Sequence, residues 1–352
     1  MKKFYLFVWV LATIMILSAG CKKENQVPAY TPPSELTPAN CFIITEAGTF
    51  SFAVKKGNSS ELVEGVSTAE VLWESFGTSS APQEKDIIES VSYQDGVITF
   101  STPSALKDGN AVIAAKDAND NILWSWHIWV CEGYEAFDSA QKYLDGCFIM
   151  DRNLGATSAT PGEIGSLGLL YQWGRKDPFL GWDGQTASTQ AKSTGSWPAA
   201  VQSDATNGNV EFATKNPTTF IKCNTNNYDW YYSNTSSTDK TRWKSTKTKY
   251  DPCPDGWRVC AMVWGSSTVS HKTEQKGWEL KFGDDVKAWY PQAGYLDKDG
   301  AGLVNSGLIA YWWSLSSDGV SVRGLEVNNN SVQTQSTQNR AAGVSVRCQR
   351  EF

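Results

Sequence analysis

The 352-residue chain has only two histidines, and it lacks the short motifs that mark many enzymes and metal sites. It contains no H-E-x-x-H, no C-x-x-C, no P-loop and no G-x-G-x-x-G, so zinc and nucleotide sites of these kinds are not indicated. Catalysis needs a positioned acid, base or nucleophile. His127 and His271 fall in different parts of the chain and suggest no Ser-His-Asp or Cys-His set. We therefore predict no catalytic residue, no cofactor and no metal.

A hydrophobic run long enough to cross a membrane is also missing near the start. The apolar run from Phe4 to Leu17 has 14 residues, and a transmembrane helix needs about 20. Two lysines before this run and three small residues after it predict a signal peptide over residues 1–20. Because Cys21 follows directly, the segment resembles a bacterial lipoprotein signal, in which this cysteine is acylated. An ordinary secretory peptide is the alternative.

Acidic residues outnumber basic residues in the rest of the chain. Removing residues 1–20 takes the formal net charge from −6 to −8. An acidic exterior disfavours nucleic acid and electrostatic membrane binding, so we expect membrane attachment only through acyl chains on Cys21. Residues 21–39 contain four prolines and little that could enter a core, which is typical of a tether.

Residues 40–132 carry the pattern of a small β-sandwich of immunoglobulin-like type. About seven short runs are rich in β-branched and aromatic residues, and turn residues separate them. The sequences 94–96 (QDG) and 119–121 (NDN) predict two hairpins. In the run 122–130, one set of alternate side chains is wholly apolar. His127 belongs to the other, mixed set and is predicted to be half-buried, whereas His271 lies in a polar stretch and is predicted to be solvated.

Beyond a junction at residues 131–146, the chain becomes rich in Gly, Ser, Thr and Asn and carries clusters of aromatic residues. The stretch 167–173 could form a helical turn or two. Aromatic rings beside Asn and Asp are common where proteins hold sugars or other proteins, although packing beneath loops is the alternative for each ring. The candidate ligand-binding residues are Tyr228, Trp230, Tyr232, Tyr295, Trp312 and Trp313.

Paired carboxylates occur in two places but do not predict a reaction. Asp284 adjoins Asp285, and Asp297 lies two residues before Asp299. Acids spaced in this way are usually solvated turn formers rather than a glycosidase pair. The sequence from Asp297 begins like a calcium-binding EF-hand loop, but the ligands required later in that loop are missing, so no calcium site is predicted.

Six motifs resemble, in their order along the chain, those of the Fibrobacter succinogenes major paralogous domain, a module of bacterial surface lipoproteins related in fold to C-type lectins. They are MDRNLGA, LYQWGRKDPF, DPCPDGWRV, YPQAGYLDKDG, AYWWSLSS and VSVRC, and the resemblance covers residues 145–352. It implies an α+β C-type-lectin-like domain after the mainly β sandwich, which itself is similar to the sandwich of fimbrillin-like proteins. The chain departs from the family at residues 260–262, where the family continues with a proline and a helix. The sugar-binding triplets of calcium-dependent lectins are absent, so their activity is not implied.

The resemblance also implies a disulfide between Cys253, at the rigid entrance to the module, and Cys348 near its end. Two separate buried thiols are the alternative. Cys131 with Cys147 and Cys223 with Cys260 are guesses for further pairs, which would leave Cys41 as the odd thiol.

These features together predict a lipid-anchored protein of the outer membrane, exposed at the cell surface. Its module would display loops for adhesion or for capture of a glycan or a surface protein, as an accessory or tip component of fimbriae with fimbrial subunits as partners. A surface carbohydrate-active enzyme and a structural spacer without a ligand are the alternatives. No nucleic-acid partner is expected.

Overall fold

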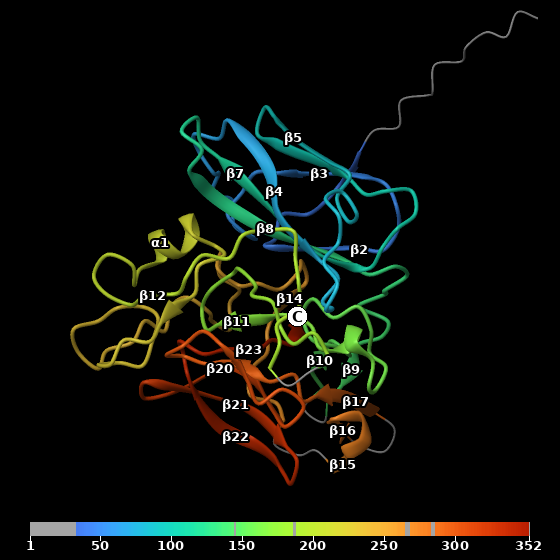
Figure 1. The fold of residues 1–352 in the computed structure, drawn as a ribbon, viewed down its shortest axis with the longest axis vertical. Coiled ribbons are helices and arrows are strands. Elements are labelled where there is room, and N and C mark those ends of the chain that lie inside the picture. Colours follow the sequence, from blue (N-terminus) through green and yellow to red (C-terminus); the bar gives the residue numbers. More distant parts are fainter. Residues whose placement is uncertain (1–32, 144–145, 186–187, 265–267, 283–285, 352) are drawn as a thin grey trace, which may run out of the picture. The chain divides into compact units, whose positions relative to one another are not determined.

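The strands of the protein form several separate sheets, two in an N-terminal sandwich and the others in the C-terminal part. A computed structural model describes residues 33–143, 146–185, 188–264, 268–282 and 286–351; for 268–273, 282, 286 and 287 it describes the backbone alone. From Pro33 onward the chain forms one unit. The sandwich strands run from blue to teal in Figure 1, and the ribbon formed by the last long strands is orange to red.

The N-terminal part is a sandwich of two four-stranded sheets, in the orders β1-β3-β6-β5 and β2-β8-β7-β4. The strands are β1 (Ser34–Glu35), β2 (Cys41–Ile44), β3 (Thr49–Ala53), β4 (Thr68–Ser75), β5 (Ser90–Gln94), β6 (Val97–Ser101), β7 (Gly109–Lys116) and β8 (Ile122–Val130). Alternate apolar side chains from both sheets meet in one core, as Phe52, Ile98 and Trp126 do. The predicted β-sandwich is therefore confirmed. Because β1 pairs with β3, residues 34 and 35 of the predicted tether belong to the sandwich.

Both predicted hairpins are present. Asp95 and Gly96 have φ angles of 50° and 82° and join β5 to β6, while Asp120, with φ of 67°, lies between β7 and β8. Asp and Gly tolerate this left-handed region better than other residues, which explains why they occupy these turns.

Strand β8 is buried on both faces. Its apolar face enters the sandwich core, and its mixed face is covered by the segment that follows Arg152: the indole N–H of Trp129 donates to the carbonyl oxygen of Ala156 at 3.1 Å. His127 is only 2 % exposed, so the prediction of a half-buried histidine is wrong. The reason is that a second layer, distant in sequence, covers the face that a lone sandwich would leave to solvent.

The C-terminal part contains four more sheets and one α-helix among the described residues, α1 (Val210–Lys215). The largest sheet contains β11 (Leu170–Gln172), β18 (Tyr295–Leu296), β19 (Leu303–Val304), β20 (Ile309–Asp318), β21 (Ser321–Asn328), β22 (Val332–Asn339) and β23 (Gly343–Ser345). The other sheets contain β9 (Gln141–Lys142), β10 (Phe148–Ile149), β14 (Trp257–Val259) and β24 (Cys348–Arg350); β15 (Thr268–Lys272), β16 (Gly277–Phe282) and β17 (Val286–Pro291); and β12 (Val201–Gln202) with β13 (Ile221–Lys222).

Helical structure in this part is short. A helical turn over 167–173 is not found: a 3₁₀ turn (Ile164–Ser166) precedes it, Gly168 has φ of 71°, and β11 follows and pairs with β23. A second 3₁₀ turn spans Thr273–Gln275. None of the helices among the described residues is long and apolar enough to cross a bilayer.

The disulfide between Cys253 and Cys348 is confirmed. Its two Cα atoms lie 5.9 Å apart although the cysteines are 95 residues apart in sequence. β14 begins four residues after Cys253 and pairs with β24, with Val259 opposite Cys348. The bond therefore joins the two ends of the segment 253–348 beside one pair of strands.

The sandwich and the C-terminal part share a buried polar seam. Lys176 is 4 % exposed. Its ammonium group donates to the carbonyl and hydroxyl oxygens of Ser125 in β8 and to the carboxylate of Asp177. The hydroxyl of Ser125 donates to the same carboxylate at 2.6 Å. Every charge at this seam thus has hydrogen-bonding partners, as burial requires.

Candidate functional site

The three tryptophans among the six predicted ligand-binding residues are core residues. Trp230, Trp312 and Trp313 are each 1 % exposed. Their indole N–H groups donate to the carbonyl oxygen of Trp173, the Asn153 side chain and the carbonyl oxygen of Tyr171, respectively. Buried rings with satisfied N–H groups are typical of packing. In this structure the rings at these three positions pack in the core, which is the alternative weighed for single rings.

The three tyrosines are at least partly exposed but do not meet in one hollow. Tyr228 is 42 % exposed, and Tyr232 and Tyr295 are intermediate. The ring of Tyr295 packs edge-on against that of Tyr311, with centroids 5.2 Å apart. None of the six predicted residues lines the cavity around Phe179, Trp197 and Phe220 or the groove between β4 and β5.

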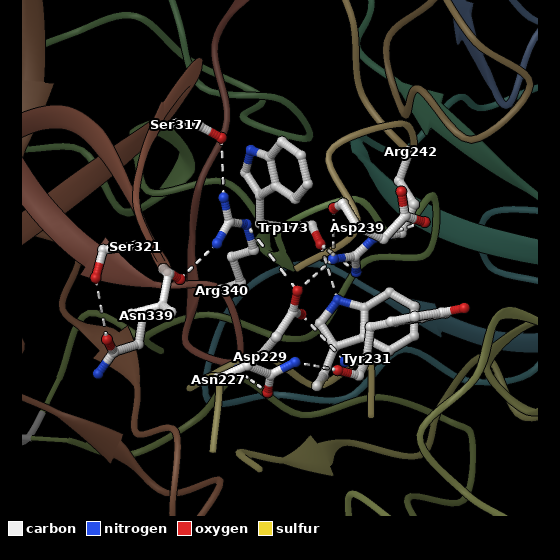
Figure 2. A network of polar contacts seen from close by, with 12 residues as sticks. Trp173, Asn227, Asp229, Tyr231, Asp239, Arg242, Ser317, Ser321, Asn339 and Arg340 are labelled. Atoms are coloured by element: carbon white, nitrogen blue, oxygen red, sulfur yellow. Dashed lines mark hydrogen bonds and ion pairs between the residues drawn. The ribbon is translucent and has the colours of Figure 1, made fainter. Parts of the chain in front are cut away.

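A buried charged network anchors the polar and aromatic loop over 224–243 (Figure 2). Asp229 lies between two guanidinium groups: its Oδ2 is 2.5 Å from Nη2 of Arg242 and 4.0 Å from Nε of Arg340, and all three side chains are at most 1 % exposed. The Arg242 guanidinium also lies 4.4 Å from the ring centre of Trp230. These contacts explain why the loop is both polar and aromatic: it packs through its charges and rings.

An aromatic pocket lies elsewhere in the C-terminal part and is the candidate site. This cavity, which we call the aromatic pocket, has a volume of about 220 Å³. It is lined by Phe179, Leu180, Gln190, Ala191, Trp197, Pro198, Ala200, Thr218, Phe220, Leu296 and Ala301. Three rings from distant parts of the sequence meet here. The ring centres of Phe179 and Phe220 are 5.4 Å apart, and those of Phe179 and Trp197 are 6.3 Å apart.

The segment 190–198, which we call the strap, supplies four of these lining residues and crosses to the sandwich. Thr194 N–H donates to the carbonyl oxygen of Glu74 in β4, and Glu74 N–H donates to the hydroxyl of Thr194. A Cβ on Gly195 would lie 2.4 Å from that of Trp73, so only glycine permits this approach. The strap therefore lies directly against β4.

Trp197 is held in place on the strap by contacts with both parts of the protein. Its indole N–H donates to the hydroxyl of Ser193 at 2.8 Å, and its ring packs against that of Trp73, with centroids 5.6 Å apart. The ring is partly exposed, whereas Phe179 and Phe220 are 3 % and 5 % exposed. Trp197 thus presents a fixed ring at the accessible side of the pocket while the two phenylalanines form its buried wall.

The lining carries no charged side chain. Its polar side chains are Gln190, whose Nε2 donates to the carbonyl oxygen of Leu180, and Thr218. Within the described residues, the Thr218 hydroxyl and the Gln190 amide oxygen have no hydrogen-bond partner. Arg175 approaches the ring of Phe179 to 5.0 Å but does not line the pocket. Its Nη1 and Nη2 groups donate to Gln172 and to backbone carbonyls of 213–219, while its buried Nε has no partner within the described residues.

A larger groove of about 490 Å³ lies on the other side of the strap, between β4 and β5. Its most buried acid is Glu74, whose carboxylate accepts hydrogen bonds from the backbone N–H groups of Lys85, Ile87 and Ile88. Burial raises the pKa of Glu74. This carboxylate holds the loop between β4 and β5 and is not free for chemistry.

Of the other titratable candidates, Asp297 has a structural role. Asp297 caps a turn by accepting from the N–H groups of Asp299 and Gly300, and Asp284 and Asp285 lie outside the described residues. The side chain of His271 also lies outside them. Across the part of the chain that the structure describes, no group of three or more His, Cys, Asp and Glu side chains could hold a metal ion.

The two further disulfides guessed from the sequence do not form. Cys131 and Cys223 are buried thiols, and burial raises the pKa of each to about 11. The Cys131 thiol donates to the carbonyl oxygen of Thr157, and the Cys223 thiol donates to the carboxylate of Asp299. Cys41, the expected odd thiol, is also reduced and buried, and its pKa is raised. Such thiols are poor nucleophiles.

The aromatic pocket was missed because its rings are isolated in sequence. Phe179, Trp197 and Phe220 lie about 20 residues apart, whereas the sequence criterion selected clusters of adjacent rings. The one local signal was Gly195, two residues before Trp197. Glycine allows two backbones to approach closely.

Comparisons of the chain with protein-family models, with curated proteins and with solved structures gave no match.

Proposed function

We propose that the protein is a non-enzymatic binding protein of the bacterial cell surface that captures its ligand in the aromatic pocket. The observation that carries this proposal is a preformed cavity with an accessible ring, Trp197, held at both its N–H group and its packed face. A ring fixed before binding loses little conformational freedom when a ligand stacks on it.

The lining favours capture over bond-breaking. None of its side chains can act as a general acid or base, and Thr218 has no base among the other lining residues to activate it. The chemistry available is apolar contact, stacking and a few hydrogen bonds, which is the usual make-up of a ligand pocket.

The setting follows from the sequence. We propose that residues 1–20 direct export, that acylated Cys21 anchors the protein in the outer membrane, and that the C-terminal part is a C-type-lectin-like module carried on an immunoglobulin-like sandwich. Adhesion, as an accessory or tip component of fimbriae, is the role that the resemblance suggests.

Binding of the whole protein to arrays of glycans and of surface proteins tests this function, followed by mass spectrometry of each bound molecule. We expect retention without cleavage. Trp197→Ala should reduce retention at least tenfold, since it removes the accessible ring. Phe137→Ala, which removes a 48 % exposed ring outside the pocket, should leave retention unchanged. A cleaved product, or equal retention by the two variants, would contradict the proposal.

A further inference from the structure

The composition of the aromatic pocket restricts the chemical class of its ligand. A buried charge needs a charged or strongly hydrogen-bonding partner. Since no lining side chain is charged, an ionised group entering the pocket would lose water without gaining an ion pair. Arg175 does not line the pocket, and both of its Nη groups already donate to Gln172 and to backbone carbonyls, so only its buried Nε is without a partner within the described residues. The pocket therefore suits an uncharged group.

The size of the pocket restricts the ligand further. Its volume of about 220 Å³ is below the range of roughly 300–1,000 Å³ typical of sites for drug-sized molecules. A pocket of this size suits a small group, about one six-membered ring, rather than a drug-sized molecule.

The arrangement of polar atoms distinguishes a sugar from a purely apolar ligand. A pyranose ring has a face of C–H groups that stacks on an aromatic ring, and hydroxyl groups around its edge. The pocket offers the partly exposed side chain of Trp197, the hydroxyl of the partly exposed Thr218 and the amide oxygen of the exposed Gln190, and neither polar atom has a protein partner within the described residues. A sugar can hydrogen-bond to both atoms in place of water, whereas an apolar side chain that covers them cannot.

We propose that the aromatic pocket binds one uncharged pyranose ring, as found at the end of a neutral glycan chain. The sugar stacks on Trp197, rests against Phe179 and Phe220, and bonds to Thr218 and Gln190. This inference rests on the proposed function, because it names the ligand class of the same pocket. It requires no calcium, since the hydrogen bonds and the stacking come from the lining itself.

The test uses the whole protein and defined monosaccharides. Methyl glycosides of glucose, galactose, mannose, fucose and N-acetylglucosamine are compared with glucuronic acid and N-acetylneuraminic acid by saturation-transfer NMR and titration, in the presence of EDTA. We expect at least one neutral sugar to bind with a Kd on the order of 1 mM or tighter, and the two acids to bind at least tenfold more weakly.

Two variants separate a sugar from other occupants. Thr218→Val keeps the side-chain shape and removes the hydroxyl, so it should weaken sugar binding about five- to tenfold. Thr206→Val makes the same change at an exposed position outside the pocket and should have no effect. Trp197→Ala should abolish binding. Near-UV circular dichroism and urea denaturation establish that each variant is folded.

The outcomes distinguish failure of the ligand class from failure of the function. Preference for an acidic sugar, absence of binding by every neutral sugar at tens of millimolar, or unchanged affinity in Thr218→Val would overturn the neutral-sugar proposal. If arrays still show a ligand whose binding depends on Trp197, the binding function stands with another occupant, such as an apolar side chain of a partner protein. If no ligand depends on Trp197, both proposals fail.

Discussion

The buried ring of His127 makes the stability of the protein depend on pH in a direction that the structure fixes. Nε2 lies 2.8 Å from Oδ1 of Asn110, whose Nδ2 donates to the carbonyl oxygen of Gly155. The Asn110 oxygen therefore faces the ring, and Nε2 carries the proton of the neutral imidazole. Nδ1 is buried and has no partner within the described residues. A second proton there would be a buried donor without an acceptor, so burial lowers the pKa of His127 to about 3.

The sign and size of the effect follow from this pKa. Between the unfolded pKa of about 6.5 and the folded pKa of about 3, the unfolded chain binds a proton that the folded protein does not. The free energy of unfolding contributed by His127 is thus complete above pH 6.5 and is lost as the pH falls. At about 1.4 kcal/mol for each pKa unit, roughly 3 kcal/mol is lost between pH 7 and pH 4.

Buried acids change the free energy of unfolding with pH in the opposite direction, so their contribution must be separated from that of His127. Burial raises the pKa of Asp251 to about 6, so the folded protein takes up this proton more readily than the unfolded chain, and the contribution of Asp251 rises as the pH falls from 6 to about 4. The pH profile of the natural protein is therefore a sum. The difference between that profile and the profile of a His127 variant isolates the histidine.

The assay is urea denaturation from pH 4 to pH 8, followed by tryptophan fluorescence. His127→Gln keeps a side-chain N–H for Asn110 but cannot be protonated, so it should lose about 3 kcal/mol less than the natural protein between pH 7 and pH 4. Parallel profiles for His127→Gln and the natural protein would refute the buried neutral histidine.

Two further predictions concern the C-terminal part. Replacing Cys253 and Cys348 together by alanine removes a cross-link over 95 residues and should lower the free energy of unfolding in urea by about 4.7 kcal/mol on the loop-entropy model. As a control, Cys223→Ala should lower it by less than about 1.5 kcal/mol. Equal losses in the two variants would argue against the cross-link. Gly324→Ala would place a Cβ 2.0 Å from the carbonyl oxygen of Trp312 across the β20–β21 pair and should cost at least about 2 kcal/mol, while Gly302→Ala, which meets nothing within 4 Å, should cost less than about 1 kcal/mol. Equal melting temperatures for these two variants would contradict the register of that pair.

Local chemistry predicted those parts of the fold that local chemistry determines. The turns at Asp95-Gly96 and Asp120 follow from residues that tolerate positive φ, and the two apolar faces of the sandwich follow from alternation. His127 shows where this reasoning ends. Its surroundings are set by Asn110 on the neighbouring strand and by a loop near Gly155, and no pattern within β8 carries that information.

The ring clusters show a second limit. Adjacent aromatic residues in a strand point to opposite faces, so Trp312 and Trp313 can both be core residues only if both faces are covered. The C-terminal part provides that cover, with Asn153 accepting from one indole and the Tyr171 carbonyl from the other. The adjacent rings of Trp312 and Trp313 therefore mark packing rather than a ligand site, while Trp197, which is partly exposed at the aromatic pocket, is isolated among Gly, Ser and Pro.

Through the strap, the position of a lining residue of the aromatic pocket depends on the contact between the sandwich and the C-terminal part. Thr194 bonds to β4 on one side, and Ala191 donates its N–H to the carbonyl oxygen of Gly181 on the other. Trp197 consequently packs on Trp73 of the sandwich and on Phe179 of the C-terminal part. The lining residues of the pocket all belong to the C-terminal part, but the sandwich supports the ring of Trp197 through Trp73, and no sequence pattern within either part indicates this contact. If the pocket binds a ligand, the sandwich helps to set the position of the ring on which that ligand stacks.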